Sequence, residues 1–106
     1  MLTVLIRYKG SNGNAKKFVD EMISLGIVKE IRNEVGNLRY EYFFPIEDNE
    51  SVLLVDSWDN QEALDRHHQL PLMNKIKELR EKYDLHMEVE KYQSLVDSKD
   101  EQYIRR

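Results

Sequence analysis

Residues 34–44 read E-V-G-N-L-R-Y-E-Y-F-F, residues 52–59 read V-L-L-V-D-S-W-D, and residues 60–71 read N-Q-E-A-L-D-R-H-H-Q-L-P. The first two segments alternate between two sets of side chains, and this period of two residues predicts two neighbouring β-strands. The third segment begins with residues that favour a helix N-terminus, so it predicts a helix directly after the second strand. Trp58 would end that strand and His67 would lie one or two turns into the helix, so both side chains could face one pocket.

The flanking segments extend this pattern in both directions. Residues 2–9 are β-branched and apolar, as in a central strand that is buried on both faces. Residues 15–25 place apolar side chains at helical spacing, and residues 27–34 add one or two helical turns. Pro71 begins another helix, and residues 85–95 alternate as a last strand. The order is strand, helix, strand, strand, helix, strand, which is the split βαβ pattern of a ferredoxin-like α+β domain.

This pattern predicts a four-stranded antiparallel sheet with helices on one face. The opposite face also carries large apolar side chains, and such a face needs a cover. Homodimerisation through the open face is our expectation. The alternative is that the tail, residues 96–106, covers the face, although a short and mostly polar segment buries little apolar area. We place one domain at residues 1–95 and the tail after it, where Tyr103 and Ile104 hint at a docked end.

Composition excludes several classes of function. A chain of 106 residues makes one domain, and its net charge of -4 argues against a nucleic-acid partner, which needs a basic surface. There is no cysteine, so disulfides, thiolate nucleophiles, iron–sulfur clusters and thiolate zinc sites are excluded. The longest apolar run is far short of a membrane span, and the N-terminus lacks the pattern of a signal peptide. We therefore expect no membrane partner and a soluble, cytoplasmic protein.

The same segments resemble a known family. E-V-G-N-L-R-Y-E-Y, the strand that ends in D-S-W-D, and E-A-L-D-R-H-H-Q-L-P are similar to the antibiotic biosynthesis monooxygenase domain. The similarity covers about residues 1–93 and depends on residues in a fixed order, namely Gly36, Asn37, Tyr40, Trp58, Ala63, His67 and Pro71. It implies a homodimer of ferredoxin-like subunits whose sheets pack into a dimeric α/β-barrel, with a pocket between the sheet and the helices of each subunit.

The resemblance also implies a chemistry. Members of the quinol monooxygenase branch oxidise phenolic or quinol substrates with O2 and use no metal, flavin or haem. We therefore expect no cofactor, and a small aromatic substrate and O2 as partners. Another branch degrades haem with a histidine about two and a half turns beyond the position of His67, where this chain reads N-K-I-K-E. That departure argues against haem degradation.

His67 is the candidate catalytic residue, and Trp58 is its candidate neighbour. A histidine titrates near working pH, so it suits a general base that removes a phenolic or enolic proton. The resulting anion is electron-rich enough to donate an electron to O2 directly, so the chemistry needs no cofactor. Trp58 would be a pocket wall that stacks on a flat substrate. The alternatives are a helix histidine bonded to a nearby carbonyl or carboxylate, and a core aromatic at a strand end.

Asn37, Arg39 and Tyr42 are the candidate residues for holding a substrate oxygen. Asn37 could instead be a turn residue, Arg39 could pair with Glu41, and Tyr42 could simply pack in the core. No metal site is expected, because His68 points about 100° away from His67 around the helix and no histidine spacing of a metal site occurs.

Three functional hypotheses remain open. The first is a cofactor-independent monooxygenase that acts on a small quinol, phenol or polyketide-like molecule. The second is an isomerase or related enzyme for a small phosphorylated carbonyl compound, because a sugar-processing branch of the family shares the same motifs; its activity would not depend on oxygen. The third is a non-catalytic dimeric module that binds a ligand or a protein.

Overall fold

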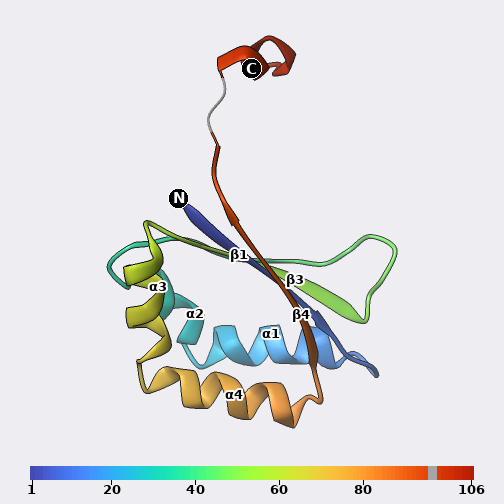
Figure 1. Ribbon diagram of the computed structural model, residues 1–106. Helices are drawn as coiled ribbons and strands as arrows, with labels where there is room; N and C mark the ends of the chain where they lie inside the picture. Colours follow the sequence, from blue (N-terminus) through green and yellow to red (C-terminus); the bar gives the residue numbers. More distant parts are fainter. Residues whose placement is uncertain (96–97) are drawn as a thin grey trace.

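A computed structural model describes residues 1–95 and 98–106 (Figure 1). The four strands form one antiparallel sheet with the order β2-β3-β1-β4, as the ferredoxin-like pattern predicts. The central strands are the two that read as most apolar, because only they have a neighbour on each side. The strands are β1 (Leu2–Lys9), β2 (Asn37–Phe43), β3 (Ser51–Trp58) and β4 (His86–Gln93).

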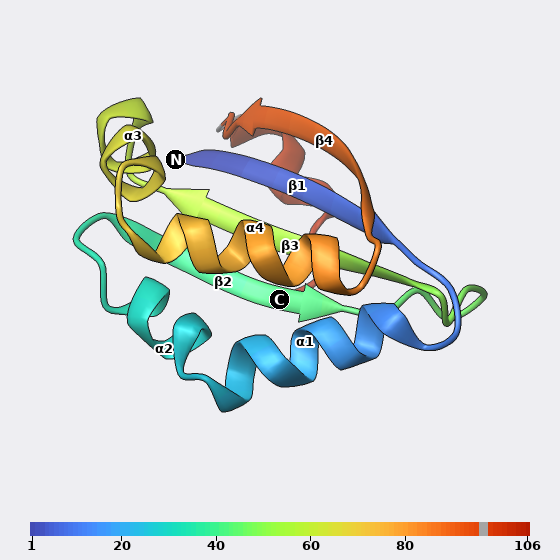
Figure 2. The same cartoon turned by 90° about the horizontal axis from the view of Figure 1, so that it is seen from below.

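The helices all belong to one side of the sheet. Helices α1 and α4 lie side by side over its face, and α3 stands at the end of the sheet where β3 finishes (Figure 2). Gly26 separates α1 from α2, since its φ of 76° is a conformation that favours glycine. The helices are α1 (Asn14–Ser24), α2 (Ile27–Arg32), α3 (Gln61–His68) and α4 (Leu72–Lys82), with a 3-10 turn η1 (Ser98–Tyr103) near the C-terminus.

The core lies between the sheet and these helices. Alternate residues of the central strands face it, so the period of two residues in the sequence becomes one buried row on each strand. Asp56 is the one polar residue in the inward row of β3, and it is 4% exposed. The large side chains that are fully buried in the core are Tyr8, Phe18, Met22, Ile31, Leu54, Trp58, Ile76 and Leu79.

Strand β2 is less regular than its sequence predicts. Simple alternation would place Leu38, Tyr40, Tyr42 and Phe44 on one inward face. The pairing with β3 shifts register between Asn37 and Arg39, and Leu38 is 51% exposed. Such a shift opposes two residues to one and turns the extra side chain out of its row. Phe44 lies beyond the end of the strand, so Tyr40 and Tyr42 alone continue the inward row.

The open face of the sheet has an apolar centre, which Phe43 of β2, 41% exposed and paired with Leu53, extends towards one edge. Leu5, Leu53 and Val55 are half-buried there. Charged side chains surround them, with ion pairs between Lys9 and Glu88 at 2.8 Å and between Arg39 and Glu41 at 3.0 Å. The homodimer through this face stays a prediction.

The C-terminal tail leaves the open face uncovered. Tyr103 is 82% exposed and Ile104 is 48% exposed, so the docked end that the sequence hints at is not formed within this chain. Figure 1 shows the C-terminal segment beyond the end of β4. The boundary that we predict at Val96 lies outside the described residues. Across the described ranges, every helix is too short or too polar to cross a membrane.

Candidate active site

Strand β3 and helix α3 bring Trp58 and His67 together. The Asn60 side chain accepts a hydrogen bond from the Ala63 amide at 2.9 Å, which caps the N-terminus of α3. The buried side of α3 then faces the end of β3, and His67 is one of its residues. The two rings lie 4.7 Å apart between centroids with a tilt of 33°. The meeting that the sequence predicts therefore occurs, and Trp58 is fully buried in it.

Glu34 holds the other edge of the imidazole. Its carboxylate oxygens lie 2.9 and 3.1 Å from His67 Nδ1. The His67 side chain is 4% exposed and the Glu34 side chain is 13% exposed. A carboxylate accepts hydrogen bonds, so Nδ1 carries the hydrogen and the Nε2 lone pair is left as the proton acceptor. In the described ranges no protein group bonds Nε2.

Asp56 lies on the opposite edge of the tryptophan. The Trp58 indole N–H donates to Asp56 Oδ1 at 2.8 Å. Burial, with a contribution from the negative charge of Glu34, raises the pKa of Asp56 to about 7, and the bond from Trp58 opposes that rise. Asp56 is therefore a buried group that can take or give a proton near neutral pH.

Two tyrosines continue the polar row across the sheet. Tyr40 pairs with Asp56 in the β2–β3 register, and the Tyr40 and Tyr42 rings meet edge to face at 5.7 Å between centroids. Burial raises the pKa of Tyr42, so its phenol stays a neutral donor. The Tyr42 hydroxyl is buried and makes no hydrogen bond of normal geometry within the described residues. A polar contact with the Tyr40 side chain opposes the rise of the Tyr42 pKa, so Tyr40 is its nearest polar neighbour on this strand.

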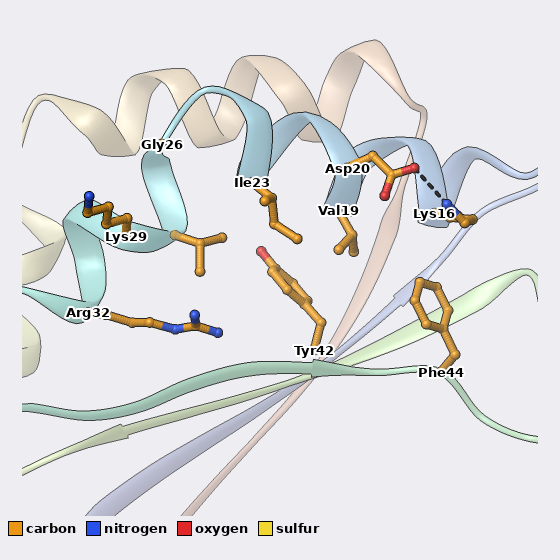
Figure 3. A pocket seen from close by; sticks show the side chains of 10 residues that line it. Lys16, Val19, Asp20, Ile23, Gly26, Lys29, Arg32, Tyr42 and Phe44 are labelled. Atoms are coloured by element: carbon orange, nitrogen blue, oxygen red, sulfur yellow. Dashed lines mark hydrogen bonds and ion pairs between the residues drawn. The ribbon is translucent and has the colours of Figure 1, made fainter.

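Tyr42 also lines a cavity that lies between α1, α2 and β2 (Figure 3). We call it the α1–β2 pocket, and its volume is about 630 Å³. Its walls combine an apolar set with charged residues at the rim. The apolar residues are Val19, Ile23, Val28 and Phe44, and the charged ones are Lys16, Asp20, Lys29 and Arg32.

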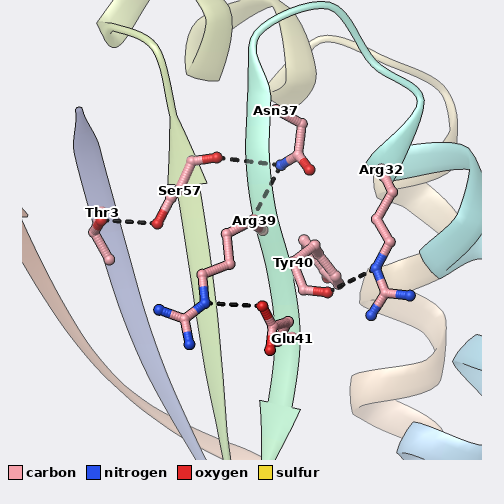
Figure 4. A network of polar contacts seen from close by, with 7 residues as sticks. All are labelled: Thr3, Arg32, Asn37, Arg39, Tyr40, Glu41 and Ser57. Carbon is pink, nitrogen blue, oxygen red and sulfur yellow. Dashed lines mark hydrogen bonds and ion pairs between the residues drawn. The ribbon is translucent and has the colours of Figure 1, made fainter. Parts of the chain in front are cut away.

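Asn37 and Arg39 lie elsewhere, at a groove of about 490 Å³ along the outer edge of β2. Figure 4 shows the polar contacts around this groove. The Asn37 amide donates to the Ser57 carbonyl at 3.3 Å, and Arg39 Nε donates to Glu41 at 3.0 Å. The five predicted site residues thus occupy three places: a buried pair, the α1–β2 pocket with Tyr42, and this edge groove.

Of the other histidines, His68 packs its ring beside that of His67, with 5.6 Å between centroids, and His86 lies apart. His68 is exposed, and partial burial together with the neighbouring His67 lowers its pKa. The His86 side chain is 82% exposed at the start of β4. Within residues 1–95 and 98–106, no three potential ligands come together to hold a metal ion.

Sequence reasoning missed Glu34, Asp56 and Arg32. Asp56 was detectable, because it is a carboxylate at an inward position of a strand whose neighbours Leu54 and Trp58 are apolar. Glu34 carries no such pattern. It meets His67 across 33 residues of sequence, and only the folded chain brings the two together.

Comparisons with known proteins agree on one family of structures. The family model for antibiotic biosynthesis monooxygenase matches residues 1–79. A proposed antibiotic biosynthesis monooxygenase of Deinococcus radiodurans has 18% identity and a TM-score of 0.79, covering 92% of this chain and 95% of its own. SnoaB of Streptomyces nogalater, a cofactor-independent oxygenase, has 11% identity and a TM-score of 0.71, covering 92% of this chain and 95% of its own. No curated protein matches this chain in sequence.

Proposed function

This chain belongs to the antibiotic biosynthesis monooxygenase family, and we propose that it is a cofactor-independent monooxygenase of a small quinol or phenol. The observation that carries the proposal is the imidazole of His67, packed on Trp58 with Nδ1 bound by Glu34 and with Nε2 free of protein bonds. A carboxylate that fixes the tautomer of a histidine is the arrangement of many general bases.

The substrate site is the α1–β2 pocket. Its size falls within the range of roughly 300–1,000 Å³ that small-molecule sites occupy, and its apolar walls suit an aromatic ring. The Tyr42 hydroxyl is buried, so it would donate a hydrogen bond to a substrate oxygen only after a neighbouring side chain moves. The buried row of Tyr42, Tyr40, Asp56 and Trp58 connects this pocket with His67.

The reaction needs no electron carrier because the substrate supplies every electron. His67 takes the phenolic proton through the buried row that includes Asp56, because His67 does not line the pocket, and the anion gives one electron to O2. The two radicals combine to form a C–O bond, which gives a hydroperoxide. Its O–O bond then breaks, one oxygen leaves in water with hydrogen from the substrate, and the ring becomes the hydroxyquinone. A quinol and O2 thus become a hydroxyquinone and water.

In this proposal Trp58 positions its neighbours. Its indole is fully buried and its N–H is bonded to Asp56, so stacking of a substrate on the ring requires that a neighbouring side chain moves first. Asn37 and Arg39 border the separate edge groove, where they could hold a substrate oxygen only of a molecule that extends across β2. The functional unit that we propose is a homodimer.

Oxygen uptake by the metal-stripped protein against a panel of quinols and phenols tests this function. We expect uptake above the rate of autoxidation, and a decrease of roughly a hundredfold in His67→Ala, since a positioned base contributes about that much. His86→Ala is the matched control, because this imidazole is exposed at the start of β4, and it should keep wild-type turnover.

Two results would count against the proposal. Unchanged turnover in His67→Ala would remove His67 from the mechanism, and Asp56→Asn would then identify the remaining acceptor. No uptake with any quinol or phenol would reject the monooxygenase and leave the isomerase and the binding module as the alternatives.

A further inference from the structure

We propose that the α1–β2 pocket binds an apolar molecule that carries an anionic oxygen group, and that Arg32 anchors this group. The inference rests on the proposed function, because it concerns the pocket in which we place the substrate. It adds the chemical class of that substrate, a planar acid in place of a neutral phenol.

Arg32 is held in place and still has donors to offer. Its Nε donates to the Tyr40 carbonyl at 2.9 Å, which fixes the guanidinium against the edge of β2 (Figure 4). In the described part of the chain, its terminal nitrogens bond no protein group and it forms no ion pair. A guanidinium fork that is fixed at Nε and free at its ends matches the two oxygens of a carboxylate or the oxygens of a phosphate.

The charge of the pocket is opposite to that of the whole chain. The chain carries a net charge of -4. At the pocket, Lys16 pairs with Asp20 at 2.8 Å, while Lys29 and Arg32 have no acidic partner in the described ranges. Cations that stay unpaired in an acidic protein concentrate positive potential at one opening, and this attracts an anion.

The rest of the pocket is built for an apolar body. Val19, Ile23 and Phe44 face the space beside the Tyr42 ring (Figure 3), and Val28 also lines the pocket. The volume of about 630 Å³ exceeds what one benzene ring fills and suits a fused two-ring body. Because the Tyr42 hydroxyl is buried, Tyr42 contributes its ring to these walls.

Binding of stable two-ring probes tests the inference without oxygen chemistry. Calorimetry would compare 2-naphthoate with methyl 2-naphthoate, which has the same rings and no charge, and with 2-naphthyl phosphate and inorganic phosphate. We expect both charged naphthyl ligands to bind at least tenfold more tightly than the ester. The tighter of the two charged ligands identifies the anionic group as a carboxylate or a phosphate.

Substitutions then locate the anchor. Arg32→Gln should weaken 2-naphthoate about tenfold and leave the ester unchanged, and Arg32→Lys, which keeps the charge without the fork, should recover only part of the loss. Lys77→Gln on the exposed side of α4 removes the same charge far from the pocket and should bind like wild type. Circular dichroism would confirm that each variant is folded.

Three outcomes would overturn the inference. They are equal binding of the acid and the ester, an equal loss in Arg32→Gln and Lys77→Gln, and inorganic phosphate that binds as tightly as 2-naphthyl phosphate. None of these outcomes depends on turnover. A protein that oxidises neutral quinols without any preference for acids would keep the proposed function and lose this inference.

Discussion

At the scale of single residues, the burial of the Asp56 carboxyl lowers the free energy of unfolding near neutral pH. A buried carboxyl with a pKa raised to about 7 binds its proton more tightly in the folded state than in the unfolded chain, where the usual value is 3.8. The folded state therefore loses stability as the pH rises from about 4 to about 7. The full penalty above pH 7 is up to about 4 kcal/mol, since each pKa unit is worth 1.36 kcal/mol.

Asp56→Asn should remove this penalty and keep an acceptor for the Trp58 indole. Urea unfolding at pH 5 and pH 8 is the measurement. We expect the variant to gain stability relative to wild type between the two pH values, by roughly 1–3 kcal/mol. Asp59→Asn, at an exposed carboxylate three residues away, is the control and should show no such gain. A pH-independent difference between Asp56→Asn and wild type would show that the carboxyl titrates alike in both states.

The sequence predicted His67 better than it predicted the surroundings of His67. Its position on the helix and its contact with Trp58 follow from spacing along two adjacent elements. The hydrogen bond between His67 and Glu34 and the full burial of the Trp58 indole do not follow from spacing. They depend on a loop that comes from a distant part of the chain. A residue type identifies a candidate base, whereas a partner from another element decides which nitrogen is available.

At the scale of elements, the turn before β2 packs closely against helix α3. Gly36 has a φ of 89°, and a Cβ there would lie 2.6 Å from the Ala63 Cβ. Gly13 has a similar φ of 74°, with no atom within 4 Å of a Cβ. The two glycines therefore share the backbone requirement and differ in the space available to a side chain.

Gly36→Ala should destabilise the protein more than Gly13→Ala. Both substitutions place an alanine in a left-handed backbone conformation, which lowers the free energy of unfolding by about 1–2 kcal/mol. In Gly36→Ala the new methyl group also overpacks against α3, which lowers it by roughly 1–3 kcal/mol more. Urea unfolding of both variants measures the difference, and equal losses would mean that α3 moves aside freely. Because α3 carries His67, we expect Gly36→Ala to lower turnover as well.

The register shift in β2 shows where pattern reasoning failed at this scale. Alternation predicted four inward residues on β2, whereas only Tyr40 and Tyr42 of these four lie in the inward row. A bulge depends on how two strands pair, and pairing is a property of both strands together. The same limit applies at the start of α1, where the Asn14 amide donates to the Tyr83 carbonyl, a contact between distant segments of the chain.

At the scale of the whole molecule, the open face of the sheet predicts the assembly. Sedimentation velocity should find the 12.7 kDa chain as a dimer at micromolar concentration. Leu53→Glu should dissociate it, because a charge would enter the half-buried centre of the face. Val35→Glu is the control, since Val35 is 82% exposed in the loop before β2. A wild-type protein that sediments as a monomer would contradict the prediction.

The sequence by itself determined the order of elements, the ferredoxin-like sheet, the inward rows of the central strands and the meeting of Trp58 with His67. These features follow from periods of two and 3.6 residues, which are local and legible in one chain. The tertiary structure alone decided that Glu34 holds the imidazole, that Asp56 stays buried beside Trp58, and that Arg32 lines both the α1–β2 pocket with Tyr42 and the edge groove with Asn37 and Arg39. Burial and pairing between distant segments set these features, and no spacing along the chain records which segments will touch.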